Sequence, residues 1–310
     1  MRIVFMGTPE FAVPSLKALC ENGYEVVGVF TQPDRPKGRG NRMAASPVKE
    51  YAVARGIPVF QPQRIRRDGV EDLRALAPDL CVTAAFGQIL SQEVLDIPPL
   101  GNINVHASLL PRHRGSAPIA WALMQGDSEA GVTTMMMDKG IDTGDMLLKS
   151  ATAIRPGETC GELTARLSEL GAALLLDTLK ALEAGTLERI PQNEAEMTYD
   201  PILTKEMGII DWTLPAGEIV NRVHGLNPWP GCSTAFEGGR LKLLRAEAID
   251  GSGQPGEVLA ADAKSGLVIA AGEGAVKVLL MQAPGGKPME PKVYLNGHPM
   301  RTHVVLKEEI

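Results

Sequence analysis

An amide and an imidazole stand two residues apart near the end of a short apolar segment, Asn104 and His106 within residues 101–106. Side chains two apart in an extended strand share one face, so these two groups are expected to lie side by side. A buried strand carries polar groups only where they have partners. A carboxylate is available from Asp142, whose flanking glycines favour a tight loop that could return it to the histidine.

Asn, His and Asp without a Ser or Cys nucleophile form a poor hydrolase triad. They form a suitable site for acyl transfer when the nucleophile belongs to the substrate. His106 and Asn104 could then stabilise an oxyanion, while Asp142 keeps the imidazole protonated and helps to remove the amine proton. The spacing alone leaves open the alternative that His106 is a core histidine with ordinary partners and Asp142 a turn residue. A metal site is the weaker hypothesis, because His106 and His113 are seven apart and have no third ligand at helical spacing.

The first half of the chain alternates short apolar segments with helical patterns. We predict strands at residues 3–6, 25–30, 80–85 and 102–106, and helices near 10–21, 46–55 and 158–184. Such alternation predicts βαβ units and a mostly parallel, Rossmann-like α/β sheet, which binds ligands at the carboxyl ends of its strands. The single Gly7 after the first strand does not complete a G-x-G-x-x-G signature, so a dinucleotide cofactor is a weak hypothesis.

The pattern of apolar and polar residues changes in the last third of the sequence. Periodicity is lost between residues 186 and 204, and a helix near 216–225 is followed by short alternating strands separated by glycine pairs. That pattern predicts a small all-β barrel or sandwich. We therefore expect a first domain at 1–186, a linker at 187–204 and a second domain at 205–310. Trp229, which lies between two prolines, is expected to be a buried anchor rather than a stacking platform.

Composition excludes several classes of protein. With 310 residues, 44% of them apolar and 22% charged, the chain can bury a real core. Its four cysteines are too widely spaced for a disulfide framework or a zinc site, which favours reduced thiols and a cytoplasmic protein. We find no apolar stretch long enough for a secretory signal or a membrane helix. The formal net charge of −6 argues, taken as a sum, against a nucleic-acid partner.

Seven motifs, in order along nearly the whole chain, resemble the folate-dependent formyltransferase family. They are Phe5-x-Gly-Thr-Pro9, Gln32-Pro-Asp-Arg-Pro36, Ile103-Asn-Val-His106, Ser108-Leu-Leu-Pro111, Arg114-Gly-x-Ala-Pro-Ile119, Gly140-Ile-Asp-Thr-Gly-Asp145 and Asn227-Pro-Trp-Pro230. The resemblance implies that the formyl group of 10-formyltetrahydrofolate is transferred, without a metal, to the α-amine of methionine on initiator tRNA, for translation initiation. It implies an N-terminal Rossmann-like domain and a small C-terminal OB-like β-barrel that contacts tRNA.

The same resemblance assigns roles to individual residues. Asn104, His106 and Asp142 match the family's catalytic trio. The segment near the pterin is matched by Phe86, Gly87 and Gln88, and the loop beside the folate by Ser108, Leu109, Leu110 and Pro111.

The acceptor is the remaining question, because relatives in this family formylate a sugar nucleotide or a purine precursor instead. Residues 31–67 hold nine Lys and Arg against two acidic residues, a local net of +7, while residues 68–204 carry −11. A basic loop of this kind suits an acceptor stem, since Lys and Arg neutralise phosphates and Arg stacks on unpaired bases. We expect tRNA contacts from Arg35, Lys37, Arg39 and Arg42, with Arg39 and Arg42 leading. The alternatives are a small-molecule formyltransferase and a non-catalytic folate- and RNA-binding protein. The protein is expected to be a monomer.

Overall fold

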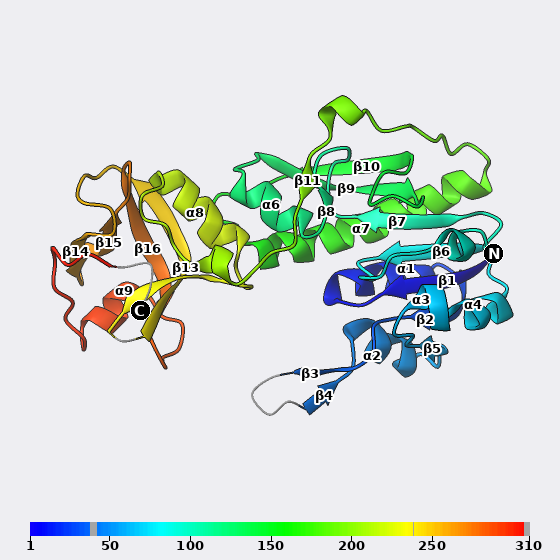
Figure 1. Ribbon diagram of the computed structural model, residues 1–310, viewed down its shortest axis with the longest axis horizontal. Coiled ribbons are helices and arrows are strands. Elements are labelled where there is room, and N and C mark those ends of the chain that lie inside the picture. Colours follow the sequence, from blue (N-terminus) through cyan, green and yellow to red (C-terminus); the bar gives the residue numbers. More distant parts are fainter. Residues whose placement is uncertain (38–41, 238, 307–310) are drawn as a thin grey trace. The chain divides into compact units, whose positions relative to one another are not determined.

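The computed structural model describes residues 1–37, 42–237 and 239–306, which form two compact units (Figure 1). The first unit comprises residues 1–115, 131–152 and 164–199. The second comprises residues 116–130, 153–163 and 200–310. Both units are therefore assembled from segments that are discontinuous in the sequence.

A seven-stranded sheet forms the centre of the first unit, in the order β10-β9-β7-β6-β1-β2-β5. Its strands are β1 (Arg2–Gly7), β2 (Glu25–Phe30), β5 (Val59–Phe60), β6 (Leu80–Ala84), β7 (Asn102–His106), β9 (Glu129–Met136) and β10 (Met146–Ala153). The first five of these pair in parallel, and β9 runs antiparallel to β7. Every residue of β6 and β7 is buried, as expected for parallel strands covered on both faces. The predicted mostly parallel α/β sheet is confirmed.

Helices connect these strands and cover the sheet. They are η1 (Glu10–Ala12), α1 (Val13–Glu21), α2 (Pro47–Ala54), α3 (Ile65–Asp68), α4 (Val70–Leu76), α5 (Gln92–Leu95) and α7 (Cys160–Glu183). Helix α2 begins as its sequence predicts, because the side chain of Ser46 accepts a hydrogen bond from Lys49 N and Pro47 occupies the first turn.

Two short ladders lie outside the main sheet. One pairs β3 (Arg35–Lys37) with β4 (Arg42–Ala44) as an antiparallel hairpin. The other pairs β8 (Arg114–Gly115) with β11 (Tyr199–Asp200). Strand β11 lies within the stretch 187–204, which also holds η2 (Glu194–Glu196), so this stretch has regular structure of its own.

The second unit is built on a five-stranded sheet, in the order β12-β13-β16-β15-β14, in which all neighbouring strands are antiparallel. Its elements are α6 (Pro118–Met124), η3 (Glu206–Gly208), α8 (Ala216–Gly225), β12 (Cys232–Phe236), β13 (Gly239–Ile249), β14 (Val258–Asp262), β15 (Gly266–Ala270), β16 (Ala275–Gln282) and α9 (Pro291–Leu295). The small C-terminal β domain, predicted as a barrel or sandwich, is confirmed as a domain built on an antiparallel sheet.

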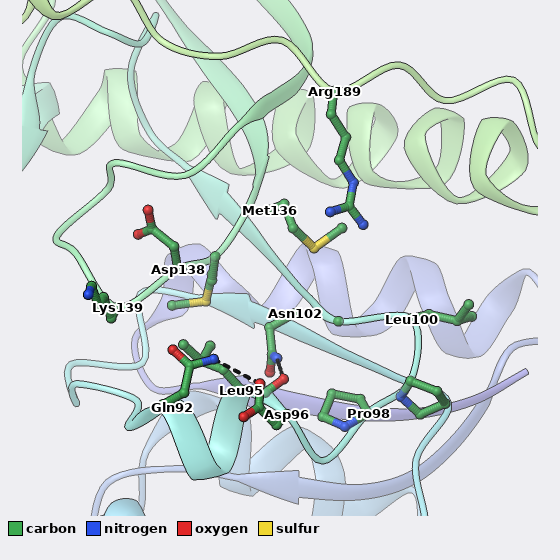
Figure 2. A pocket seen from close by; sticks show the side chains of 13 residues that line it. Gln92, Leu95, Asp96, Pro98, Leu100, Asn102, Met136, Asp138, Lys139 and Arg189 are labelled. Atoms are coloured by element: carbon green, nitrogen blue, oxygen red, sulfur yellow. Dashed lines mark hydrogen bonds between the residues drawn. The ribbon is translucent and has the colours of Figure 1, made fainter.

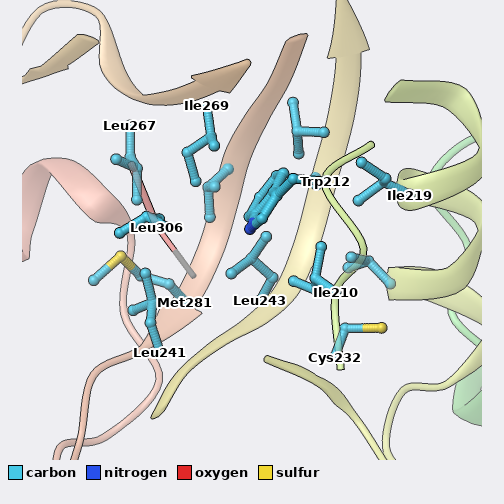
Figure 3. Packing of buried hydrophobic residues seen from close by; sticks show 14 of the residues in the cluster. Ile210, Trp212, Ile219, Cys232, Leu241, Leu243, Leu267, Ile269, Met281 and Leu306 are labelled. Atoms are coloured by element: carbon cyan, nitrogen blue, oxygen red, sulfur yellow. The ribbon is translucent and has the colours of Figure 1, made fainter. Parts of the chain in front are cut away.

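The core of this unit packs around Trp212 (Figure 3). The indole is 2% exposed and its Nε1 donates to Thr234 Oγ1 at 3.2 Å, so its one polar atom has a partner. The expectation for the other tryptophan singled out in the sequence, Trp229, is wrong. That side chain is 54% exposed, and the tryptophan of this core is Trp212.

Burial makes two of the cysteines unreactive. Cys81 and Cys232 are both at most 2% exposed, and burial raises the pKa of the Cys232 thiol to about 12. The thiolate is the reactive form, and at pH 8 only about one Cys232 thiol in 10⁴ would carry it. We predict that iodoacetamide at pH 8 modifies Cys232 only after the protein is unfolded in guanidinium, as followed by peptide mass spectrometry. Rapid modification of Cys232 in the folded protein would contradict the buried position.

Candidate active site

Strand β7 places Asn104 and His106 on one face at its carboxyl end. The strand is central, pairing Asn104 with Thr83 of β6 and with Met135 of β9. Asn104 is 9% exposed and His106 is 6% exposed. The two side chains therefore occupy the position that open α/β sheets use for ligands, in an environment with little water.

The loop between β9 and β10 brings Asp142 to the same place. Asp138 closes this loop, since its Oδ1 accepts hydrogen bonds from Gly140 N at 2.9 Å and from Thr143 Oγ1 at 2.7 Å. Asp142 itself adopts a left-handed conformation with φ of +54°, which is uncommon for a residue with a side chain. Its Oδ1 lies 3.5 Å from Asn104 Nδ2 and 3.5 Å from His106 Nδ1. The three residues proposed from the sequence are thus close together in the structure.

Residues 113–115 fix the orientation of the histidine and of the carboxylate. His106 Nε2 donates to the carbonyl oxygen of His113 at 2.9 Å, so this nitrogen carries a proton. Gly115 N donates to Asp142 Oδ2 at 2.9 Å. The remaining ring nitrogen, Nδ1, faces the carboxylate, and this contact is attractive when Nδ1 is protonated too.

The side-chain nitrogens of Asn104 and His106 point toward the same place. Asn104 Nδ2 and His106 Nδ1 lie at the same distance, 3.5 Å, from a single oxygen atom. That distance exceeds the usual 2.7–3.2 Å of such bonds, so neither donor is held strongly by Asp142. An oxyanion placed between them would accept hydrogen bonds from both. In the structure Asp142 Oδ1 lies at this point of convergence, and the two donors could stabilise a tetrahedral intermediate in acyl transfer once the oxyanion takes its place.

A second layer of residues supports the trio, and it was missed by the sequence analysis. Gln192 Nε2 donates to the carbonyl oxygens of Asp142 and Gly144, both at 2.8 Å, and Gln192 Oε1 accepts from Arg114 Nε at 2.9 Å. Arg114 is 3% exposed and pairs through both terminal nitrogens with Glu194. This hydrogen-bonded pair lowers the pKa of the Glu194 carboxyl. Both Gln192 and Glu194 come from the stretch predicted to be a linker.

The segment matched to the pterin lies after β6. Phe86 is 2% exposed, and its carbonyl oxygen accepts from Thr8 Oγ1 at 3.0 Å. Gly87 has φ of +77°, and its carbonyl oxygen accepts from Gln32 Nε2 at 2.9 Å. Gln88 accepts from Ile65 N and donates to Pro62 O, so its side chain is engaged with the scaffold rather than open to a ligand.

The loop matched to the folate follows His106. Ser108 Oγ donates to Arg112 O at 2.8 Å and closes the loop. Leu110 is 1% exposed and packs with Met135 and Met146, while Leu109 is half-buried and Pro111 buried. Leu110 therefore anchors the loop, which leaves Leu109 as its more accessible apolar side chain.

Three of the four basic residues proposed for tRNA, Arg35, Lys37 and Arg42, belong to the strands of the β3–β4 hairpin. Arg35 is exposed, and Lys37 and Arg42 are backbone partners at the end of β3 and the start of β4. Arg39 lies outside the described residues. At the base of the hairpin, Lys49 Nζ donates to Asp34 Oδ2 at 2.7 Å, and this hydrogen bond lowers the pKa of the Asp34 carboxyl. The one acidic residue of this loop is thus paired with a cation outside it.

A hollow of about 560 Å³ lies at the opposite end of β7 (Figure 2). It is lined by Leu95, Asn102, Met136, Asp138, Lys139 and Arg189, among others. None of the residues proposed for the reaction lines it, so we assign it no part in the chemistry. In the portion of the chain that the structure describes, no group of three side chains is arranged to hold a metal ion, and no helix is long and apolar enough to cross a bilayer.

Comparison with known proteins identifies the class. Residues 1–179 match the formyl transferase family and residues 202–299 match the formyl transferase C-terminal domain, so the chain belongs to the formyltransferase family. Among its curated relatives is the methionyl-tRNA formyltransferase of Caldanaerobacter subterraneus, 49% identical over 99% of this chain and 100% of that protein. The methionyl-tRNA formyltransferase of Symbiobacterium thermophilum is 51% identical over 96% of this chain and 92% of its own length.

Solved structures share the fold at lower identity. An N-formyltransferase from Helicobacter canadensis, in complex with folinic acid and dTDP-3-aminofucose, has a TM-score of 0.67 and 17% identity, over 89% of this chain and 98% of that one. HypX from Aquifex aeolicus, in complex with tetrahydrofolic acid, has a TM-score of 0.62 and 22% identity, over 95% of this chain and 47% of that one.

Proposed function

We propose that this protein transfers the formyl group of 10-formyltetrahydrofolate to the α-amino group of methionine on initiator tRNA. The observation that carries the chemistry is the convergence of Asn104 Nδ2 and His106 Nδ1 on Asp142 Oδ1, each 3.5 Å away. The choice of acceptor is supported by relatives named methionyl-tRNA formyltransferase, of which several are about half identical over nearly the whole chain.

In the proposed reaction, the neutral amine of methionine attacks the formyl carbon. A C–N bond forms and the formyl C=O becomes an oxyanion, which accepts hydrogen bonds from Asn104 Nδ2 and from protonated His106 Nδ1. Asp142 takes the proton that the amine loses. The bond from the formyl carbon to the folate nitrogen then breaks, and that nitrogen leaves with a proton from Asp142. The products are the formylated amine and tetrahydrofolate.

The donor would lie along the two loops matched to the folate. The backbone of Phe86 and Gly87 would lie against the pterin, and Leu109 would supply an apolar contact, while Ser108, Leu110, Pro111 and Gln88 hold the loops in shape. The ring of Phe86 is 2% exposed and anchors its loop in the hydrophobic core. This division follows from the contacts of these residues with the scaffold. No residue in this scheme calls for a metal ion.

The tRNA contacts are proposed for Arg35, Lys37, Arg39 and Arg42 on and between β3 and β4. We retain the division into a catalytic domain at 1–186, a linker at 187–204 and a C-terminal domain at 205–310 that contacts tRNA. A cytoplasmic monomer suffices for this reaction, because all three catalytic residues come from one chain.

The test is a formyl-transfer assay with charged initiator tRNA and 10-formyltetrahydrofolate. We expect formylmethionyl-tRNA as the product, with an amino-sugar nucleotide and a purine-precursor amine as the competing acceptors. The solved sugar formyltransferases share this fold, which makes the small-molecule function the second candidate. Faster turnover of either small acceptor than of charged tRNA would select that candidate, and an absence of transfer to any acceptor would favour a non-catalytic binding protein.

Salt gives a separate prediction about the basic hairpin. If about four cations contact phosphates, the affinity for charged tRNA should fall roughly 50- to 150-fold between 50 and 200 mM salt. Binding is measured by filter retention at a series of salt concentrations. The double variant Arg39→Ala, Arg42→Ala should bind more weakly and show a shallower slope. An affinity that is flat with salt would contradict the proposed contacts.

A further inference from the structure

The side chain of Gln192 contacts both of the elements that hold the catalytic trio. One element is the loop that carries Asp142, and the other is the stretch 113–115, which holds His106 through a carbonyl oxygen and Asp142 through a backbone amide. Gln192 Nε2 donates to the carbonyl oxygens of Asp142 and Gly144, and its Oε1 accepts from Arg114 Nε. Gln192 is far from both in the sequence, with separations of 50 and 78 residues.

The chemistry of these partners fixes the orientation of the amide. Two carbonyl oxygens require the NH₂ end, and the guanidinium Nε–H requires the oxygen end. In a flipped amide, Oε1 would face the two carbonyl oxygens and Nε2 would face the Nε–H of Arg114, so all three hydrogen bonds would be lost. All three bonds, at 2.8, 2.8 and 2.9 Å, have ordinary lengths.

The position of the Asp142 carboxylate depends on hydrogen bonds from outside the catalytic trio. Asp142 lies in the left-handed region, with φ of +54°, which is uncommon for a residue other than glycine. Its Oδ1 makes only long contacts, at 3.5 Å, with Asn104 and His106, so these do not fix the loop. The short bonds to Asp142 come from Gln192 Nε2 and Gly115 N.

The anchor of Gln192 is itself rigid. Arg114 is 3% exposed and binds Glu194 with two nitrogens, at 2.7 and 3.1 Å. Thr198 accepts from two neighbouring backbone amides, since its Oγ1 accepts from His113 N and its carbonyl oxygen accepts from Arg114 N. Residues 192–198 therefore hold the backbone of His113 and Arg114.

We propose that Gln192 is a positioning residue for the formyl-transfer reaction. It holds the Asp142 carboxylate at the distance and orientation from His106 and Asn104 that the reaction requires. It does this through hydrogen bonds to the Asp142 and Gly144 carbonyls and to the buried Arg114 side chain, which pairs with the exposed Glu194. This inference rests on the proposed function for its kinetic consequence, but its structural consequence is independent of the substrate.

The experiment compares Gln192→Glu and Gln192→Leu with wild type. Gln192→Glu keeps the shape and the partner of Arg114 but replaces the two donated hydrogen bonds by repulsion with two carbonyls. We expect kcat to fall about 10- to 100-fold, as for a catalytic group displaced by about 1 Å, while KM for the folate and for charged tRNA changes less than threefold. Gln125→Leu, at an exposed glutamine of the second unit, is the matched control and should retain wild-type kinetics.

A second measurement follows the site without substrate. In protein with ¹⁵N-labelled histidine, we expect the His106 ring signals to shift in both Gln192 variants and not in Gln125→Leu. Wild-type kcat in Gln192→Glu, a change confined to KM, or unshifted His106 signals would each overturn the proposal. If wild type itself fails to formylate charged tRNA, the proposed function fails, while the His106 signals still decide the role of Gln192.

Discussion

The His106→Ala protein is expected to form formylmethionyl-tRNA with a kcat about 10³-fold below that of wild type, while KM for both substrates changes little. The loss has two sources, since the substitution removes one of the two donors that converge on the oxyanion and unpairs Asp142 from its imidazole. Removing one such donor from a site that excludes water costs about 10²–10³ in rate, and loss of assisted proton transfer adds to this.

Single-turnover kinetics with preformed charged tRNA measure this effect on the chemical step. Asn104→Ala should lose about 10²-fold by the same reasoning, and the double variant should be only slightly worse than His106→Ala, because residues acting as one unit are not additive. His303→Ala is the matched control, since that imidazole is 79% exposed on the second unit. A His106→Ala rate within threefold of wild type would remove His106 from the mechanism.

The parts of this site that follow local rules could be predicted from the sequence. Asn104 and His106 share a face because the period of a strand is two, and Asp142 returns to them because glycines permit the turn. The βαβ pattern also placed β1, β2, β6 and β7 correctly.

Contacts between distant segments could not be predicted in this way. Gln192 and Glu194 lie in a stretch with no periodicity, and nothing local indicates that Arg114, some 80 residues earlier, is their partner. Strands β9 and β10 were also absent from the prediction. β9 is buried almost throughout, so it lacks the alternation that marks a half-exposed strand. The exposure of Trp229 could not be predicted either, because burial depends on tertiary packing that the local sequence does not show.

Gly144 is the position where one methyl group is expected to disrupt the site most. A Cβ at this residue would lie 1.8 Å from the carbonyl oxygen of Met136 and 3.0 Å from its carbonyl carbon. Both atoms belong to the backbone of β9, so the loop and not a flexible side chain must move. Its displacement would break the Gln192 hydrogen bond to Gly144 and carry Asp142 away from His106.

We therefore expect Gly144→Ala to lower kcat at least 10²-fold and to cost about 1–3 kcal/mol of unfolding free energy, as overpacking does. Urea denaturation followed by far-UV circular dichroism gives the stability, and the formylation assay gives the rate. Gly217→Ala is the matched control, because a Cβ there meets no atom within 4 Å and the residue lies in helix α8. Replacing a helical glycine in this way should stabilise the protein by roughly 0.5–1 kcal/mol and leave the rate unchanged. Wild-type activity in Gly144→Ala would show that the loop can be displaced without loss of catalysis. The claim that catalysis depends on the position of Asp142 would then be wrong.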